Sequence, residues 1–135
     1  WPIWIAQEKG YFAKDGIEFL PSATDLSHLI AQVGVLTERA PDPVELQAVG
    51  LGWRAAKAIA GRDGGQTAGV SSGAVVALEG LEGTDACIRR ACDLTRSDGR
   101  DVHHLVVVKV AKPKQDLRFD LPVIALRSSL TRLIS

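Results

Sequence analysis

The sequence has 135 residues, of which 46% are hydrophobic and 24% are charged, as is typical of a soluble globular protein. Sixteen basic residues balance sixteen acidic residues, so the net charge gives no reason to expect binding to nucleic acid or to an anionic membrane. No run of about 18 apolar residues is present, which excludes a bilayer-spanning helix.

Hydrophobic periodicity and turn signals predict three helices and a short strand in the first 60 residues. Pro2 suits the first turn of a helix, Asp15-Gly16 is a stop signal, and Thr24 or Asp25 can cap a second helix. The predicted segments are helices over residues 2–15, 25–33 and 43–60 and a strand over residues 17–20.

The third helix has the clearest start in the sequence. Asp42 at the N-cap position and Glu45 three residues later form a capping box, with Pro43 at the first helical position. Gly50 and Gly52 each lower helix propensity by about 1 kcal/mol. We interpret them as marking the close approach of another element.

The second half of the chain predicts a hairpin, a helix and a strand. Residues 66–71 and 74–79 flank the turn signal Ser72-Gly73, Thr84 caps a helix over residues 85–96, and the β-branched run 105–110 is typical of a strand buried on both faces. We expect an α/β fold, a mixed sheet with flanking helices, in which residues 105–110 form the central strand. The predicted core consists of periodic apolar positions, namely Leu46, Val49, Trp53, Val76, Leu78, Ile88, Val106 and Val108.

The first motif that can carry chemistry is Leu78-Glu79-Gly80-Leu81-Glu82-Gly83-Thr84-Asp85. A strand that runs through a glycine turn into a helix N-terminus brings backbone N–H groups together and predicts an anion site. Glu82 and Asp85 add carboxylates that can hold Mg²⁺ against a phosphate. The alternative is that Asp85 only complements the helix dipole and that Glu82 is solvated.

The second motif runs from Lys109 to Pro122 and contains four cations, two carboxylates and a glutamine. Phosphoryl chemistry needs this mixture, because cations stabilise charge on oxygen while carboxylates hold a metal or orient water. In an extended segment Asp116, Arg118 and Asp120 point to one face. The alternative is a basic surface loop balanced by its own acids.

The remaining reactive side chains indicate no further site. Cys87 and Cys92 are five residues apart, which is not a CxxC pair, and we expect reduced, partly buried thiols. His28, His103 and His104 do not form a metal set. The Walker A, GxGxxG and GxSxG patterns are absent, so P-loop and serine-hydrolase functions have no support.

Residues 17–124 resemble the LpxI family of UDP-2,3-diacylglucosamine pyrophosphatases. The resemblance is carried by Gly34-Val35-Leu36-Thr37, Gly52-Trp53-Arg54-Ala55-Ala56-Lys57, Glu82-Gly83-Thr84-Asp85 and the stretch from Val108 to Pro122. It implies one domain over residues 1–135, similar to the catalytic half of the family, with a generic helix over 1–16 and an atypical tail over 125–135. Because the chain lacks methionine and opens with Trp1-Pro2, we expect it to be part of a longer protein.

The resemblance implies Mg²⁺-dependent hydrolysis of UDP-2,3-diacylglucosamine to UMP and lipid X, a step of lipid A biosynthesis. Asp120 and Asp85 would be the catalytic carboxylates and, with Glu82, the metal ligands. The implied ligands of the substrate phosphates are Thr37, Lys109, Lys112, Gln115 and Arg118. The family is cytoplasmic; contact with the inner membrane surface and a homodimer are left open.

Two other functions compete with this interpretation. Residues 4–17 are similar to the opening segment of periplasmic solute-binding proteins of the sulfonate and thiamine-precursor type, which would make the chain a small-molecule-binding protein. The second competing interpretation is an inactive or partner-dependent fragment that keeps the core of the fold.

Overall fold

The computed structural model describes residues 5–6, 8–18, 31–62 and 64–112 of the chain. These residues fall into two compact units, one ending at Gln32 and one beginning at Val33.

The first unit contains a short helix, α2 (Tyr11–Lys14), where a continuous helix over residues 2–15 was predicted. The prediction is wrong in its extent because Gly10 precedes α2 in the left-handed conformation, with φ 66°, and interrupts the helix. Ile17 and Glu18 are described and do not form a strand. The rest of the strand predicted over 17–20, and most of the helix predicted over 25–33, lie outside the described residues.

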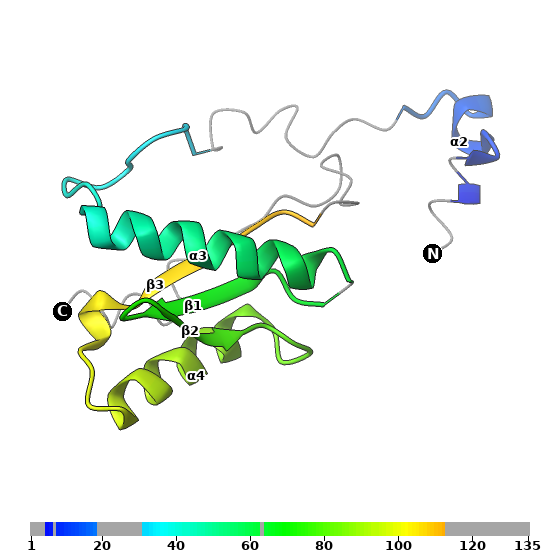
Figure 1. Cartoon of the computed structure of the whole chain (residues 1–135). Coiled ribbons are helices and arrows are strands. Elements are labelled where there is room, and N and C mark those ends of the chain that lie inside the picture. Colours follow the sequence, from blue (N-terminus) through cyan, green and yellow to red (C-terminus); the bar gives the residue numbers. More distant parts are fainter. Residues whose placement is uncertain (1–4, 7, 19–30, 63, 113–135) are drawn as a thin grey trace. The chain divides into compact units, whose positions relative to one another are not determined.

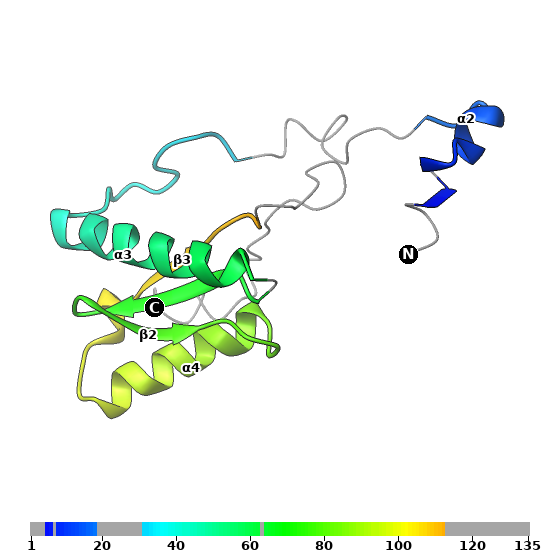
Figure 2. The ribbon, with the colours of Figure 1, turned by 45° about the vertical axis from the view of Figure 1, so that its right-hand side comes forward.

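The second unit is a three-stranded antiparallel sheet between two helices, which confirms the α/β class. The strand order is β2-β1-β3, and α3 and α4 cover opposite faces of the sheet (Figures 1 and 2). Among the described strands β1 lies in the middle, so β3 is not the central strand that we predicted. The elements are α3 (Pro43–Ala60), β1 (Thr67–Ser71), β2 (Ala74–Leu78), α4 (Thr84–Ser97), η2 (Val102–His104) and β3 (Val106–Lys109).

The predicted hairpin is present as β1 and β2. Ser72 and Gly73, between the strands, have φ values of 50° and 76°. Positive φ at both central residues is the mark of a type I′ turn, whose twist matches that of the flanking strands. All five residues of β1 are buried, as expected for a strand with a neighbour on each side.

Helix α3 begins as predicted with a complete capping box. The Asp42 carboxylate accepts from the Glu45 backbone N–H at 2.8 Å, and the Glu45 carboxylate accepts from the Asp42 backbone N–H at 2.8 Å. Two N–H groups that the helix itself cannot satisfy are therefore bonded.

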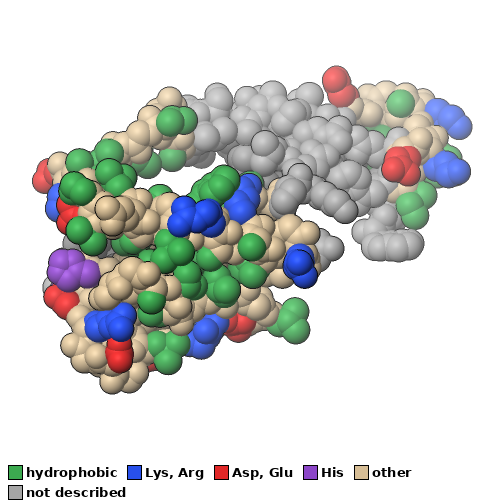
Figure 3. All heavy atoms as spheres, viewed as in Figure 1, with side chains coloured by type: hydrophobic (Ala, Val, Ile, Leu, Met, Phe, Trp, Pro, Cys, Tyr) green, Lys and Arg blue, Asp and Glu red, His purple; other side chains and the backbone are tan. Residues whose placement is uncertain are grey.

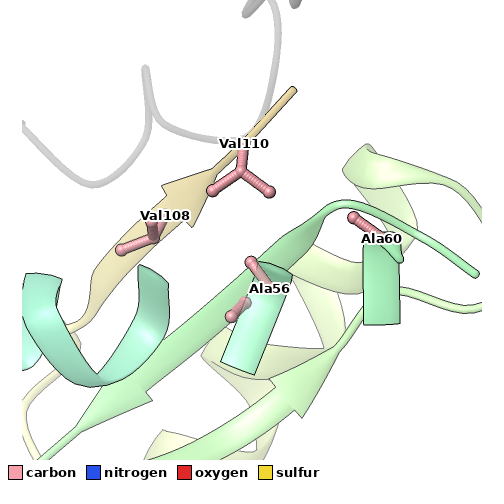
Figure 4. Packing of buried hydrophobic residues seen from close by; sticks show 5 residues of the cluster. Ala56, Ala60, Val108 and Val110 are labelled. Carbon is pink, nitrogen blue, oxygen red and sulfur yellow. The ribbon is translucent and has the colours of Figure 1, made fainter. Parts of the chain in front are cut away.

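Small residues on α3 allow the helix to approach the sheet closely, as the glycine pattern predicted. The buried residues of α3 are Gly52, Ala56 and Ala60. Figure 4 shows Ala56 and Ala60 opposite Val108, which belongs to β3, and Val110, which directly follows β3. A Cβ atom placed on Gly52 would lie 2.7 Å from Cγ2 of Val108. The helix can therefore rest at this distance only without a side chain at position 52.

The core prediction is wrong for four residues and confirmed for the others. Ile88 and Val108 are buried, and Val76 and Val106 are half-buried against the two core clusters. The exposed residues are Leu46 (55%), Val49 (39%), Trp53 (52%) and Leu78 (37%).

The three exposed residues of α3 lie beside its buried stripe. Trp53 follows Gly52 directly, and one residue is a turn of about 100° around a helix. Because Gly52 and Ala56 point at the sheet, the larger side chains are turned to the flank of the helix. Figure 3 shows hydrophobic side chains on the surface along α3, next to Lys and Arg side chains.

Helix α4 is present as predicted, but its start differs by one position. Gly83 is the N-cap and Thr84 is the first helical residue, so Thr84 does not cap the helix. Its hydroxyl is engaged elsewhere, as described below. Cys87 and Cys92 are free thiols buried on α4, and burial raises the pKa of both. The buried residues are Cys87, Ile88, Ala91, Cys92 and Thr95.

The two glycines of α3 give a matched test of this packing. We expect Gly52→Ala to lower the free energy of unfolding by about 1–3 kcal/mol, because the added methyl group overpacks against Val108. Gly50→Ala should instead raise it by about 0.5–1 kcal/mol, since the new Cβ would meet only the end of the flexible Arg54 side chain at 3.7 Å. Urea unfolding of both variants measures the difference, and an equal effect of the two substitutions would contradict the close approach.

Candidate functional site

The sheet topology brings the glycine turn and the start of the second motif, residues 109–112, to the same end of the sheet. Since β2 and β3 are both antiparallel to β1, they run in the same direction and finish on either side of the start of β1. The Glu79 N–H donates to the Thr67 carbonyl at 2.9 Å on one side, and the Val110 N–H donates to the Gln66 carbonyl at 2.9 Å on the other. The glycine turn after β2 (residues 80–83) and the lysine-rich segment that starts at Lys109 therefore begin at the same end of the sheet, on either side of β1.

Within the glycine turn, Glu82 makes contacts that stabilise the turn itself. Its carboxylate accepts from the Gly80 N–H at 2.9 Å and from the Arg90 guanidinium, which also donates to the Leu78 carbonyl at 2.7 Å. The hydrogen bond from Arg90 holds the pKa of the Glu82 carboxyl below its ordinary value. Glu82 thus ties the turn to α4, and it could bind a metal only by changing these contacts.

Asp85 lies exposed in the first turn of α4. Gly83, the N-cap residue, provides no side-chain hydrogen bond to the helix. Glu79 and Glu82 precede Asp85 at intervals of three residues, and the carboxylates of both accept hydrogen bonds from the protein. The exposed Asp85 carboxylate favours a cation, or an anion held through a cation, over a bare anion.

Glu79, which the sequence analysis did not single out, joins three elements. Its carboxylate accepts from the Gln66 N–H at 3.1 Å and from the Thr84 hydroxyl at 3.2 Å, and the Thr84 hydroxyl lies 3.4 Å from that of Thr67. The sequence signal that could have revealed it is an acidic residue at the end of a strand, directly before a glycine turn and a helix start.

The described part of the lysine-rich segment consists of the end of β3 and the three residues after it. Lys109 ends β3 and Lys112 follows three residues later, and both are half-buried. Lys57 of α3 donates to the Ala111 carbonyl at 2.9 Å and lies over the Trp53 ring, 5.9 Å from its centroid. Lys57 therefore anchors the chain where it leaves the sheet. The predicted site residues Gln115, Arg118 and Asp120 lie outside the described residues.

Thr37 and Arg39 have local partners in the loop before α3. The Thr37 hydroxyl donates to the Arg39 carbonyl at 2.8 Å. The Arg39 guanidinium donates to both carboxylate oxygens of Glu45, at 2.9 and 2.6 Å. The capping box of α3 is in this way extended to the preceding loop.

Two features of the described part of the chain bear on cofactors and membranes. In these residues no group of three or more His, Cys, Asp or Glu side chains could hold a metal ion. The helices found there are also too short or too polar to cross a bilayer.

Comparison with known proteins establishes the family. The sequence model of the LpxI C-terminal domain matches residues 32–132. The chain belongs to the LpxI C-terminal domain family. It is also 36% identical over 115 residues to the UDP-2,3-diacylglucosamine pyrophosphatase LpxI of Caulobacter vibrioides, a match that includes 84% of this chain. The chain spans 41% of the length of that LpxI protein.

The Arg39–Glu45 pair predicts a measurable pH effect. Hydrogen bonds from Arg39 and from the Asp42 backbone lower the pKa of Glu45 from 4.5 to about 2. Because this folded-state pKa is depressed, the stabilisation by Glu45 is present above pH 4.5 and is lost as the pH falls towards 2. An NMR titration should show Arg39→Gln raising the Glu45 pKa towards 4.5.

The matched control for that titration is Arg62→Gln, which removes an exposed guanidinium just after α3. It should leave the Glu45 titration unchanged. A Glu45 pKa near 4.5 in the unsubstituted protein would show that the ion pair does not persist in solution.

Proposed function

We propose that this chain hydrolyses the pyrophosphate bond of UDP-2,3-diacylglucosamine, giving UMP and lipid X, in the biosynthesis of lipid A. The support is its membership of the LpxI C-terminal domain family together with the name of the LpxI relative from Caulobacter vibrioides. The sheet topology adds to this support, because it brings the glycine turn and the lysine-rich segment to one end of β1.

Asp85 and Asp120 are the proposed catalytic carboxylates. Asp85 is exposed on the first turn of α4, so its carboxylate is available to a ligand. Glu82, the third predicted metal ligand, is already bonded to Arg90 and Gly80. We therefore place more weight on the two aspartates than on Glu82.

The proposed cations lie at and beyond the end of β3. Lys109 and Lys112 would attract the pyrophosphate, and the Arg118 guanidinium would hold two phosphate oxygens at once. Gln115 and Thr37 are proposed as further ligands of the substrate. The Thr37 hydroxyl currently donates to the Arg39 carbonyl, and as an acceptor or donor it can also meet a sugar or phosphate group.

The described residues fit Mg²⁺ only in part. They supply an acidic helix N-terminus, but no group of three possible ligands occurs among them. A Mg²⁺ site would therefore need a carboxylate from outside these residues, and Asp120 is our candidate. Bound there, Mg²⁺ would neutralise charge on the pyrophosphate oxygens.

We propose a cytoplasmic location with peripheral contact to the inner membrane, where a diacylated substrate resides. The competing proposal is that the chain is active only together with a partner. It is prompted by the length of the match, because the chain spans 41% of its LpxI relative. The assay below distinguishes the two, because a partner-dependent fragment would release no UMP alone.

The test is incubation of the purified chain with UDP-2,3-diacylglucosamine in detergent micelles, with and without Mg²⁺, followed by detection of UMP and lipid X. We expect release of both products in equal amounts and dependence on Mg²⁺. Asp120→Asn should reduce kcat by at least about 100-fold, because it keeps the size of the side chain and removes its charge. Asp85→Asn should reduce kcat by at least about tenfold.

Asp93→Asn is the control, since Asp93 is an exposed acid on the same helix as Asp85 and pairs with Arg96 at 3.4 Å. Its activity should equal that of the unsubstituted chain. A folded chain that releases no UMP would rule out the proposed activity for this chain alone. If Asp120→Asn kept near-normal turnover at saturating Mg²⁺, Asp120 would be structural.

A further inference from the structure

We propose that Glu79 is a positioning residue that holds the two halves of the site together by accepting two hydrogen bonds, without touching the substrate. The proposal rests on the proposed function of the site, but its structural part can be tested without it. Glu79 directly follows the last residue of β2 and directly precedes the glycine turn.

The first hydrogen bond, from the Gln66 N–H to the Glu79 carboxylate, takes the place of backbone pairing where β1 and β2 end. The last backbone hydrogen bond between the strands runs from the Glu79 N–H to the Thr67 carbonyl, at 2.9 Å. One residue earlier, the Gln66 N–H donates to the Glu79 side chain at 3.1 Å. The Gln66 carbonyl in turn accepts from the Val110 N–H at 2.9 Å. Gln66 therefore links the two sides: its N–H binds Glu79, and its carbonyl binds Val110, where the chain leaves β3.

The second contact closes the glycine turn. The other carboxylate oxygen of Glu79 accepts from the Thr84 hydroxyl at 3.2 Å, and Thr84 directly precedes Asp85. The hydroxyl of Thr67, which is almost fully buried, donates to the Thr84 hydroxyl at 3.4 Å. Glu79 and Thr84 are the two residues that flank the turn 80–83, so a single carboxylate sets the position of the first residue of α4 relative to the sheet.

The backbone around Glu79 leaves little room for another arrangement. A Cβ atom added to Gly65 would collide with the side chain and the carbonyl oxygen of Glu79. The glycine lets residue 66 approach closely enough for its N–H to reach the carboxylate. If this N–H lost its acceptor in the half-buried strand end, it would carry the cost of an unsatisfied polar group.

Glutamine at position 79 separates positioning from a direct role of the charge. Its amide oxygen can accept from the Gln66 N–H while its NH₂ group donates to the Thr84 hydroxyl, which can act as an acceptor. A residue that only positions the turn should therefore tolerate Glu79→Gln. A metal ligand or a group that acts through its charge should not.

The experiment measures amide hydrogen exchange by NMR and steady-state kinetics on the same variants. In Glu79→Ala we expect exchange of the Gln66 amide and of residues 80–85 to accelerate at least tenfold, with the amides of α3 unchanged. We expect kcat to fall at least tenfold while KM changes less than about threefold, because small displacements of catalytic groups are costly. Glu79→Gln should stay within about threefold of the unsubstituted chain in both readouts.

A second pair of variants tests the other end of the bond. Thr84→Val removes the hydroxyl at nearly constant volume and should accelerate exchange in residues 80–85 at least threefold, whereas Thr84→Ser should restore the original rates. Asp93→Asn again serves as the control for loss of an acid on α4. Together these variants distinguish loss of the hydrogen bond from loss of volume or charge.

Three outcomes would overturn the proposal. Unchanged protection of Gln66 and the turn in Glu79→Ala would show that the contacts are dispensable. Equal acceleration of all amides, those of α3 included, would show a global loss of stability instead of local positioning. A loss of activity in Glu79→Gln as large as in Glu79→Ala would show a direct role of the charge. If the unsubstituted chain releases no UMP, the proposed function fails while the exchange rates still decide the role of Glu79.

Discussion

Pairing of β1 with a strand on each side is the constraint on which the rest of the second unit depends. β1 is buried along its whole length, and its neighbours run antiparallel to it. Two antiparallel neighbours are necessarily parallel to each other, and here both finish level with the start of β1, one on each side of it. The glycine turn and the lysine-rich segment are distant in sequence, yet this geometry makes both begin at the same end of the sheet. A site at this place needs no long connecting loop.

The helices are fitted to this sheet by the size of their side chains. Helix α3 presents glycine and alanine to the sheet, so its axis lies close to β1 and β3. The larger Trp53 is displaced to the flank, where its ring contacts Lys57, and Lys57 reaches the carbonyl of Ala111. The packing of α3 thus affects the point at which the chain leaves β3, and with it the start of the lysine-rich segment.

The start of α4 carries three acidic residues, Glu79, Glu82 and Asp85, and they differ in their contacts. Glu79 and Glu82 are engaged with hydrogen-bond donors of the protein, while Asp85 is exposed. The first two carboxylates shape the turn, which leaves the third to meet a ligand. This division of roles agrees with the metal site that we propose, in which Asp85 is a ligand.

Local signals in the sequence were sufficient to predict the capping box at Asp42, the turn at Ser72-Gly73, the extent of α3 and α4, and the family. Each of these depends on residues that are near one another in the chain, or on a motif that is read as a string. The sequence also contained the sign of close packing at Gly52, because a glycine inside a helix has a cost that packing must offset.

Only the tertiary structure decided which side of α3 is buried and which carboxylates are engaged. Leu46, Val49 and Trp53 fit the helical period as well as Gly52 and Ala56 do, and the choice between the two stripes depends on how near the sheet lies. The role of Glu79 likewise depends on Gln66, thirteen residues away, whose N–H loses its strand partner where the sheet ends. The hydrophobic period and the order of motifs do not specify the distances between strands and helices. Those distances determine which side chains are buried and which carboxylates accept hydrogen bonds.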